Sequence, residues 1–286
     1  MNNRDTWLTS KGKISLSGRV LIMGVLNLTP DSFSDGGKFT SVDAALDRAL
    51  EMVNQGADII DVGAESTRPD ADPIPAEIEL SRINPVLEGM GDDFPVPISV
   101  DTYKADVADV ALNLGAEIVN DISGLKRDSE MAGVVARHKA GLVIMHMRGN
   151  SKTMQSLTNY RNLVADVRAE LEESAQIALG KGIELERIVF DPGIGFAKDY
   201  LQSCILINRL AELSIMERPI LVGVSRKSYI GKILNLPVEE RLEGTIAASV
   251  LSMVRGASIL RVHDVKEVKR AVEVAKVIME ESHKPT

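Results

Sequence analysis

Eight short apolar segments, each followed by a helical pattern, predict a single (β/α)8 barrel, a TIM barrel of the α/β class, in this chain of 286 residues. Short apolar strands that alternate with amphipathic helices are typical of a parallel sheet covered by helices. Eight such units match one closed barrel, which commonly takes about 250 residues. An open Rossmann-type sheet is the alternative, but no G-x-G-x-x-G motif follows the first strand.

The expected strands are apolar, often β-branched runs that stop at a polar residue or a glycine. They cover 20–26, 58–63, 96–100, 117–119, 142–145, 188–190, 220–224 and 259–260. Apolar residues at helical spacing follow each run. The expected helices cover 42–55, 76–90, 104–114, 128–139, 160–181, 200–213, 238–255 and 265–281. Glycines at 56, 115 and 256 separate a helix from the next strand, as C-cap glycines do.

The remaining sequence bounds the class of protein. Residues 1–19 are polar with scattered apolar positions, so we expect an N-terminal extension or hairpin before the barrel at 20–286. The net charge of −8 disfavours a nucleic-acid partner. No apolar run is long enough for a membrane span, and the first residues lack the apolar core of a signal peptide. We therefore expect a cytoplasmic protein. Its single cysteine, Cys204, lies in a helical pattern and is expected to be packed.

Polar residues recur where the expected strands end. The run at 188–190 stops at Asp191, because Pro192 cannot extend a sheet ladder. In (β/α)8 barrels the active site lies at the C-terminal ends of the strands. A turn or capping role is the plain alternative for any one such residue, but their convergence on one face favours a functional site. These residues are Asn27, Asp61, Asp101, Asn120, His146, Asp191, Lys227, Arg261 and His263.

The kinds of side chain suggest the ligands. Asp101, Asn120 and Asp191 offer acceptor and amide groups that suit a planar heterocycle rich in N–H donors. A buried carboxylate needs a hydrogen-bonding partner, which substrate N–H groups can supply. Arg261 and His263 share one side of their strand by the two-residue period. Together with Lys227 they suit an anion, with phosphate the best candidate.

Two long loops follow the first two strands, at 29–39 and 65–75. Both are rich in Gly, Pro, Ser and Asp, which is typical of mobile segments. Ordinary connecting loops are the alternative, but loops this long in a compact barrel are more often functional. We therefore expect them to act as lids over the strand ends.

After residue 19 the whole chain resembles the dihydropteroate synthase family. The matching motifs are NLTPDSFSDGG at 27–37, DVGAESTRP at 61–69, SVDT at 99–102, NDI at 120–122, MHM at 145–147, DPGIGF at 191–196, SRKS at 225–228 and RVHD at 261–264. The resemblance implies an enzyme that joins p-aminobenzoate to 6-hydroxymethyl-7,8-dihydropterin diphosphate and releases pyrophosphate. It also implies Mg²⁺ as cofactor, a homodimer and inhibition by sulfonamides.

The resemblance assigns residues to three subsites and a catalytic set. The pterin subsite takes Asp101, Asn120, Met145, Asp191, Gly223 and Lys227. The diphosphate subsite takes Asn27, Thr67, Arg68, Arg261 and His263, and Asn27 is also the expected Mg²⁺ ligand. The p-aminobenzoate subsite takes Phe33, Thr67, Pro69, Phe196, Ser225 and Lys227. The expected catalytic residues are Asp101, Asp191, Lys227, Arg261 and His263.

The expected reaction needs no protein nucleophile. Loss of diphosphate from a methylene group on an electron-rich pterin leaves a stabilised cation, in an SN1-like step that Mg²⁺ and cationic side chains assist. Two other functions remain open at this point: a pterin-dependent methyltransferase barrel and a pterin-binding barrel without catalysis. The methyltransferase would share the aspartates but has no need of Lys227, Arg261 and His263 as an anion-binding set.

Overall fold

The structure, a computed structural model, describes residues 4–29, 38–68, 70–213 and 215–280. An eight-stranded parallel sheet forms the barrel, in the order β8-β7-β6-β5-β4-β3-β10-β9. A parallel bridge between Phe190 and Ile220 brings the two outer strands together and closes the barrel, which confirms the predicted fold class. The strands are β3 (Leu21–Asn27), β4 (Ile59–Gly63), β5 (Ile98–Asp101), β6 (Ile118–Asp121), β7 (Gly141–Met145), β8 (Ile188–Asp191), β9 (Leu221–Gly223) and β10 (Ile259–Val262).

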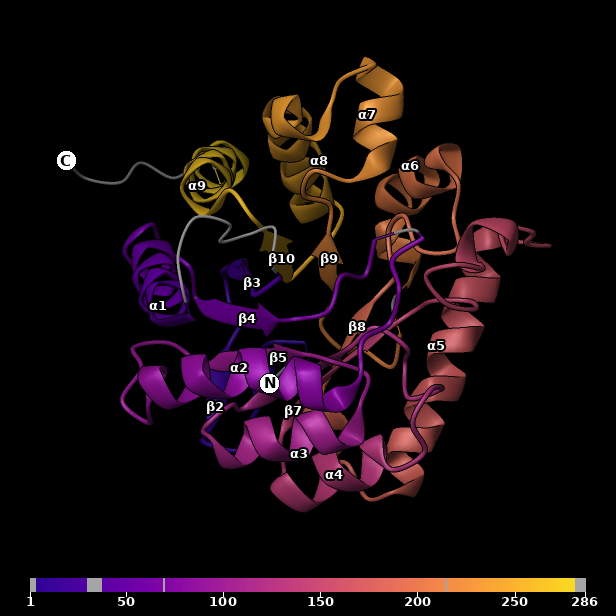
Figure 1. Cartoon of the computed structure of the whole chain (residues 1–286). Helices are drawn as coiled ribbons and strands as arrows, with labels where there is room; N and C mark the ends of the chain where they lie inside the picture. The colour runs from indigo at the N-terminus through magenta and orange to yellow at the C-terminus, as the bar shows by residue number, and fades with distance from the viewer. Residues whose placement is uncertain (1–3, 30–37, 69, 214, 281–286) are drawn as a thin grey trace.

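Helices surround the barrel on its outside, as the view down its axis shows (Figure 1). The α-helices are α1 (Lys38–Asn54), α2 (Ala76–Met90), α3 (Ala105–Asn113), α4 (Met131–His138), α5 (Leu163–Gly180), α6 (Tyr200–Asn208), α7 (Ser228–Leu234), α8 (Leu242–Val254) and α9 (Val265–Glu280). Short 3-10 turns cover Met154–Ser156, Leu185–Arg187, Leu210–Leu213 and Val238–Glu240.

The expected elements differ from the observed ones mainly at helix ends. Helix α7 is absent from the prediction, because seven residues are too few for helical spacing to be recognised. The helix expected at 200–213 ends at Asn208 and continues as a 3-10 turn, a frequent ending for α-helices. Helix α1 begins at Lys38, before the expected start at 42, and most of the first loop expected at 29–39 lies outside the described residues. Side-chain preferences at a helix start are too weak to fix such boundaries.

Two apolar layers hold the barrel together. The side chains inside it form one small core, which includes Leu21, Ile59, Val143 and Val189. The alternate residues of the same strands face the helices and join a much larger outer core. The two-residue period of a strand separates these layers, and it also decides which strand-end side chains reach the centre of the barrel.

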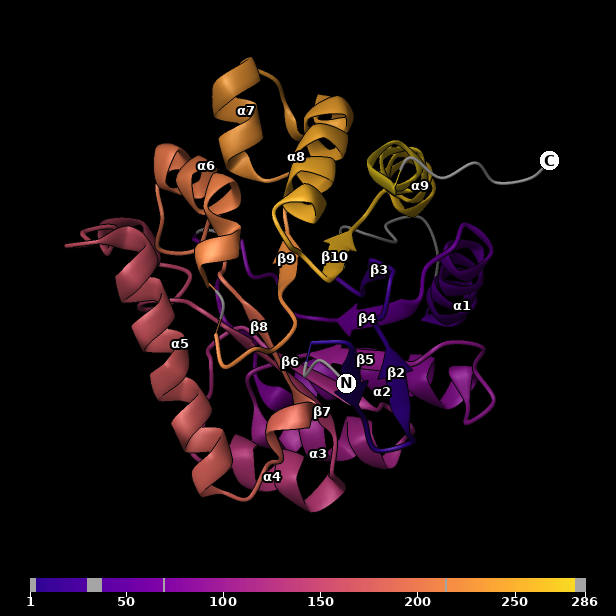
Figure 2. The same cartoon turned by 180° about the vertical axis from the view of Figure 1, so that it is seen from behind.

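An N-terminal hairpin covers the opposite end of the barrel (Figure 2). Its strands β1 (Thr6–Leu8) and β2 (Lys13–Ser15) pair antiparallel. Trp7 is fully buried against the inner core, and its indole N–H donates to the carbonyl of Arg187 at 2.7 Å. The fully buried indole packs on the inner-core side chains nearest the N-terminal ends of the strands and fills that end of the barrel. The C-terminal end is therefore the one open to a ligand.

Candidate active site

Inward-facing polar side chains form a ring at the C-terminal ends of the strands. The register places Asp101 beside Gly63 and Asn120, and Asp191 beside Met145. Asn120, Met145 and Asp191 each lie two positions after a residue of the inner core, so their side chains also turn inward. The Asp101 carboxylate turns the same way, because it contacts Arg261 across the barrel. The strand ends therefore bring together groups that are distant in the sequence.

Arg261 lies at the centre of this ring. Its Nε donates to Oδ2 of Asp61 and its Nη2 donates to Oδ2 of Asp101, both at 2.6 Å. The Asn120 side-chain amide donates to the same Asp61 oxygen at 3.0 Å. The other Asp61 oxygen is buried and has no hydrogen-bond partner among the described residues. Asp61 thus anchors Arg261, a role that its position at a strand end does not reveal.

Two carboxylates share the single guanidinium of Arg261. Burial raises the pKa of Asp101 to about 7, Arg261 opposes this rise, and the charge of Asp61 adds to it. Burial also disfavours the charge of Arg261, but Asp61 and Asp101 outweigh it and raise the pKa of the guanidinium. Arg261 is therefore held in place by two protein carboxylates.

Asp191 is fixed by the glycine-rich turn that follows it. Its Oδ1 accepts the main-chain N–H of Gly193 at 2.7 Å. Gly193 has a φ of 65°, and a Cβ there would come within 2.0 Å of the His146 carbonyl oxygen, so only glycine fits. Burial raises the pKa of Asp191, and the Gly193 bond and Lys227 partly offset this rise. A buried carboxylate in this setting needs further donors, as ligand N–H groups would provide.

Lys227 and Phe196 form one wall of the site. The Lys227 Nζ lies 4.0 Å from the centroid of the Phe196 ring, within reach of a cation–π interaction. Burial lowers the pKa of Lys227 to about 8, and Asp191 works against this change. Phe196 also packs with Met145 and Met147 in a small apolar cluster. The wall combines flat apolar contact with one cation.

A buried polar network supports this wall from behind. The Lys198 ammonium contacts the Nδ1 of His146 at 2.8 Å and donates to the Phe196 carbonyl at 2.8 Å. The His146 Nε2 lies 3.1 Å from a Glu170 oxygen, and Arg148 binds the same carboxylate. His146 therefore faces helix α5, rather than joining the polar ring as expected, because it is one residue past the inward-facing Met145.

His263 is paired with Ser225 at the end of β9. Its Nδ1 lies 3.0 Å from the Ser225 Oγ, which also accepts the His263 main-chain N–H at 3.2 Å. Burial lowers the pKa of His263 to about 4, so the imidazole is neutral at pH 7. The Ser225 hydroxyl can donate to Nδ1 or accept from it, so the pair fits either ring tautomer. Burial thus works against a positive charge on this ring.

The described residues fit Mg²⁺ only together with a substrate. None of them form a group of three or more His, Cys, Asp or Glu side chains that could hold a metal. Asn27, the expected ligand, ends β3 beside Gly63 and offers one amide oxygen. Mg²⁺ is commonly held by one or two protein oxygens, substrate phosphates and water. A single ligand is compatible with that mode.

The second lid loop is anchored to the loop after β7. The Asp70 main-chain N–H donates to the Ser151 carbonyl at 3.0 Å, and the Ser151 hydroxyl donates to the Ala71 carbonyl at 2.7 Å. Within this lid Thr67 is half-buried and Arg68 is exposed. Phe33 and Pro69, expected at the p-aminobenzoate subsite, lie outside the described residues. The sequence gives no sign of this anchor.

Comparisons with known proteins agree with this geometry. The family model described as "Pterin binding enzyme" matches residues 23–263. The dihydropteroate synthase of Bacillus subtilis is 47% identical over 266 residues, which cover 93% of this chain and 91% of the relative. The chain belongs to the dihydropteroate synthase family of pterin-binding enzymes.

Solved structures of the family share the fold closely. The Clostridium difficile dihydropteroate synthase, determined in the presence of pteroic acid, has a TM-score of 0.86 and 46% identity, covering 91% of this chain and 97% of that one. The Yersinia pestis enzyme, in complex with a sulfonamide drug, has a TM-score of 0.90 and 38% identity, covering 96% and 99%. The resemblance found in the sequence motifs is thereby confirmed.

Proposed function

We propose that this protein is a dihydropteroate synthase in which the strand-end ring holds the pterin and Mg²⁺ assists the loss of diphosphate. It condenses p-aminobenzoate with 6-hydroxymethyl-7,8-dihydropterin diphosphate to give 7,8-dihydropteroate and pyrophosphate, as its family membership indicates. The observation that supports the residue roles best is the convergence of Asp61, Asp101, Asn120 and Arg261 inside the barrel. Formation of 7,8-dihydropteroate from the two substrates tests the activity directly.

Hydrogen-bond acceptors at the strand ends bind the edge of the pterin, and the wall formed by Lys227 and Phe196 lies against it. Asp191 and Asp101 accept the ring N–H and amino groups, with Asn120 as the amide partner. Lys227 donates to the carbonyl side of the heterocycle, while Met145 and Phe196 contact its face. Gly223 faces inward beside Arg261 and leaves room for the ring, since it has no side chain.

The diphosphate lies where β3, β10 and the second lid meet. Arg261 retains N–H donors that neither aspartate uses, and His263 offers a ring N–H. Thr67 and Arg68 approach from the lid, and Asn27 would hold Mg²⁺ through its amide oxygen. Bound Mg²⁺ supplies charge neutralisation to the leaving group. The C–O bond then breaks toward pyrophosphate, and the electron-rich pterin stabilises the cation left on the methylene carbon.

The p-aminobenzoate amine attacks that carbon and then loses its proton. We assign its pocket to Phe33, Thr67 and Pro69 on the lids and to Phe196, Ser225 and Lys227 on the barrel. The two barrel side chains Phe196 and Lys227 already lie together. Sulfonamides resemble p-aminobenzoate, so the same pocket is the proposed sulfonamide site, as the Yersinia pestis complex supports.

No observation in the structure favours either of the two other functions considered from the sequence. A methyltransferase has no use for Arg261, His263 and Lys227 as an anion-binding set, and the relatives compared above are named as dihydropteroate synthases. A pterin-binding barrel without catalysis would bind both substrates and give no product. The product assay separates these outcomes.

We also propose a homodimer formed through α6, α7 and α8. These helices lie together on one side of the barrel (Figure 1) and expose large apolar side chains. The exposed apolar side chains are Tyr200, Leu201, Ile205, Ile233, Leu234, Leu251 and Val254. Light scattering after gel filtration should give twice the chain mass of 31.0 kDa, and Leu251→Glu should give a folded monomer. A monomeric wild type at tens of micromolar would contradict the proposal.

The cellular placement and partners stay predictions. None of the described helices combines the length and apolar character required to cross a bilayer. The expected partners are the two small-molecule substrates, with no nucleic acid and no membrane, and the expected location is the cytoplasm. Cell fractionation with an antibody tests the location.

A further inference from the structure

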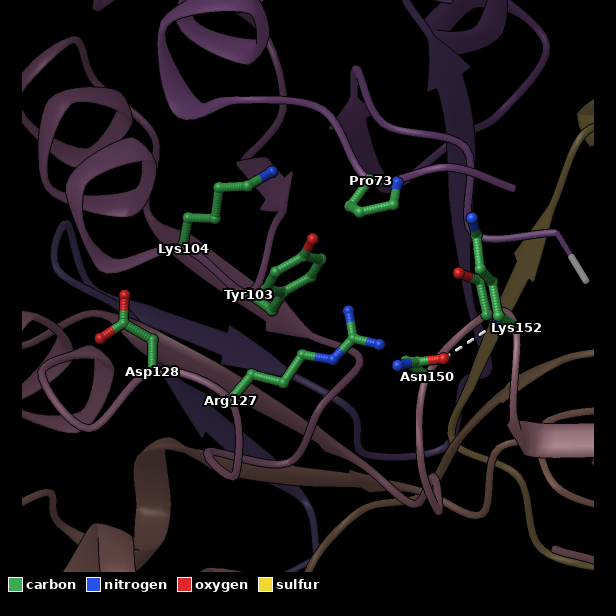
Figure 3. A pocket seen from close by; sticks show the side chains of 8 residues that line it. Pro73, Tyr103, Lys104, Arg127, Asp128, Asn150 and Lys152 are labelled. Carbon is green, nitrogen blue, oxygen red and sulfur yellow. Dashed lines mark hydrogen bonds between the residues drawn. The ribbon is translucent and has the colours of Figure 1, made fainter. Parts of the chain in front are cut away.

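A cavity of about 500 Å³ lies beside the active-site ring, between the second lid and the loops that follow β5, β6 and β7 (Figure 3). Its walls carry the cations Lys104, Arg127 and Lys152, together with Asp128 and Asn150. None of these residues has a place in the proposed reaction. The polar groups in its walls that have no hydrogen-bond partner within the residues that the structure describes indicate which kind of ligand the cavity can bind.

Three of the four charged groups are already engaged. Lys104 pairs with Glu65 at 2.5 Å, and Lys152 pairs with Asp72 at 2.5 Å. The Asp128 carboxylate accepts the main-chain N–H at the start of α3 at 2.8 Å. Lys104 also pairs with Glu79, so the charges of both lysines are already neutralised by neighbouring carboxylates.

Arg127 is the exception. Its guanidinium stacks 4.4 Å from the centroid of the Tyr103 ring. Within the described part of the chain it makes no hydrogen bond and no ion pair. An arginine that is stacked but unpaired keeps its five donors and loses little rotamer freedom on binding.

Asn150 faces Arg127 from the opposite wall. Its Oδ1 accepts the main-chain N–H groups of Lys152 at 3.0 Å and Thr153 at 3.1 Å, so the orientation of its amide is fixed. The Nδ2 is left without a described acceptor, and Figure 3 shows it directed toward the Arg127 guanidinium across the opening. Asn150 is exposed and Arg127 is half-buried, so both donors are open to a ligand that carries acceptor oxygens.

We propose that this cavity binds a phosphate-type oxyanion, with Arg127 and Asn150 as the donors. Donors on two opposite walls suit the several oxygens of a tetrahedral anion better than one planar carboxylate, and the Arg fork matches a phosphate edge. The volume also accommodates a diphosphate. Arg127 and Ser151 line a smaller hollow that contains Thr67. Pyrophosphate released by the proposed reaction would therefore contact Arg127 as it leaves the active site. This role in release rests on the proposed function, whereas oxyanion binding does not.

Binding is tested without turnover by NMR of the ¹⁵N-labelled full chain, with inorganic pyrophosphate as the probe and no Mg²⁺ or pterin present. The side-chain amide signal of Asn150 is identified by its loss in Asn150→Asp. Aspartate keeps the Oδ1 acceptor for Lys152 and Thr153 and replaces the donor with a repelling carboxylate. In the wild type the Asn150 signal should shift in a saturable way. The apparent affinity should fall by about tenfold or more in Arg127→Met, since a charge-assisted hydrogen bond is lost.

Lys126→Met is the matched control, because it removes the same charge one residue away on an exposed side chain. The Asn150 signal should still respond fully in that variant, and thermal melts check that Arg127→Met and Asn150→Asp stay folded. No shift in the wild type, or equal shifts with and without Arg127, would overturn the proposal. A tighter response to benzoate than to pyrophosphate would also overturn the assignment to phosphate. A protein without synthase activity would leave these outcomes unchanged, so the two proposals fail separately.

Discussion

Asp61→Asn should destabilise the protein and impair catalysis, although Asp61 is assigned to no substrate. The carboxylate is fully buried and holds both Arg261 and Asn120. Asparagine keeps the shape but presents one amide nitrogen to donors and leaves Arg261 with a single carboxylate. Removing one partner of a buried ion pair costs about 3–5 kcal/mol of stability. The asparagine oxygen recovers part of this, so we expect a loss of about 3 kcal/mol, or about 5 °C in Tm for a chain of this size.

The same variant changes the charge around Asp101. Loss of the neighbouring negative charge should lower the pKa of Asp101 from about 7, because Arg261 then serves Asp101 alone. The measurements are thermal unfolding and kcat/KM as a function of pH. Asp58→Asn is the control, since Asp58 accepts the Ile22 main-chain N–H at 2.9 Å below the site. It should lower Tm and leave kcat/KM unchanged. An Asp61→Asn protein with wild-type Tm and kcat/KM would refute the reasoning.

Four further predictions follow from the proposed roles. Asp191→Asn should cost about 2–4 kcal/mol in kcat/KM, because a charge-assisted bond to the pterin is lost, and near wild-type kinetics would remove Asp191 from the site. The KM for the pterin diphosphate should rise as pH passes about 8 and Lys227 loses its proton, whereas a flat profile from pH 7 to 9.5 would contradict this role. Calorimetry should show weak p-aminobenzoate binding to free enzyme and about 1–3 kcal/mol tighter binding with Mg²⁺ and pyrophosphate, if ligands order the lids; equal affinities would indicate a preformed pocket. Sulfamethoxazole should inhibit competitively against p-aminobenzoate, and full activity at saturating drug would contradict the assigned pocket.

The barrel and the inward ring follow from local patterns in the sequence. Short apolar runs set the strands, and the two-residue period predicts that Arg261 and His263 turn the same way. The abrupt stop at Pro192 predicts that Asp191 ends its strand. These features depend on neighbouring residues only, so the sequence shows them directly.

Partners across the barrel follow from tertiary packing instead. The sequence gives no reason to join Asp61 to Arg261, which are 200 positions apart. His146 is adjacent to a predicted pterin residue, yet it faces outward to Glu170. The neutral state of His263 also depends on burial, which its strand-end position does not reveal.

The most direct test of the account is an assay of 7,8-dihydropteroate formed by the purified protein. With p-aminobenzoate, 6-hydroxymethyl-7,8-dihydropterin diphosphate and Mg²⁺, we expect dihydropteroate and pyrophosphate in equal amounts. Removal of Mg²⁺ with EDTA should abolish product, and added Mg²⁺ should restore it. Binding of both substrates without product would contradict the proposed catalysis, and undiminished product in EDTA would contradict the role of Mg²⁺.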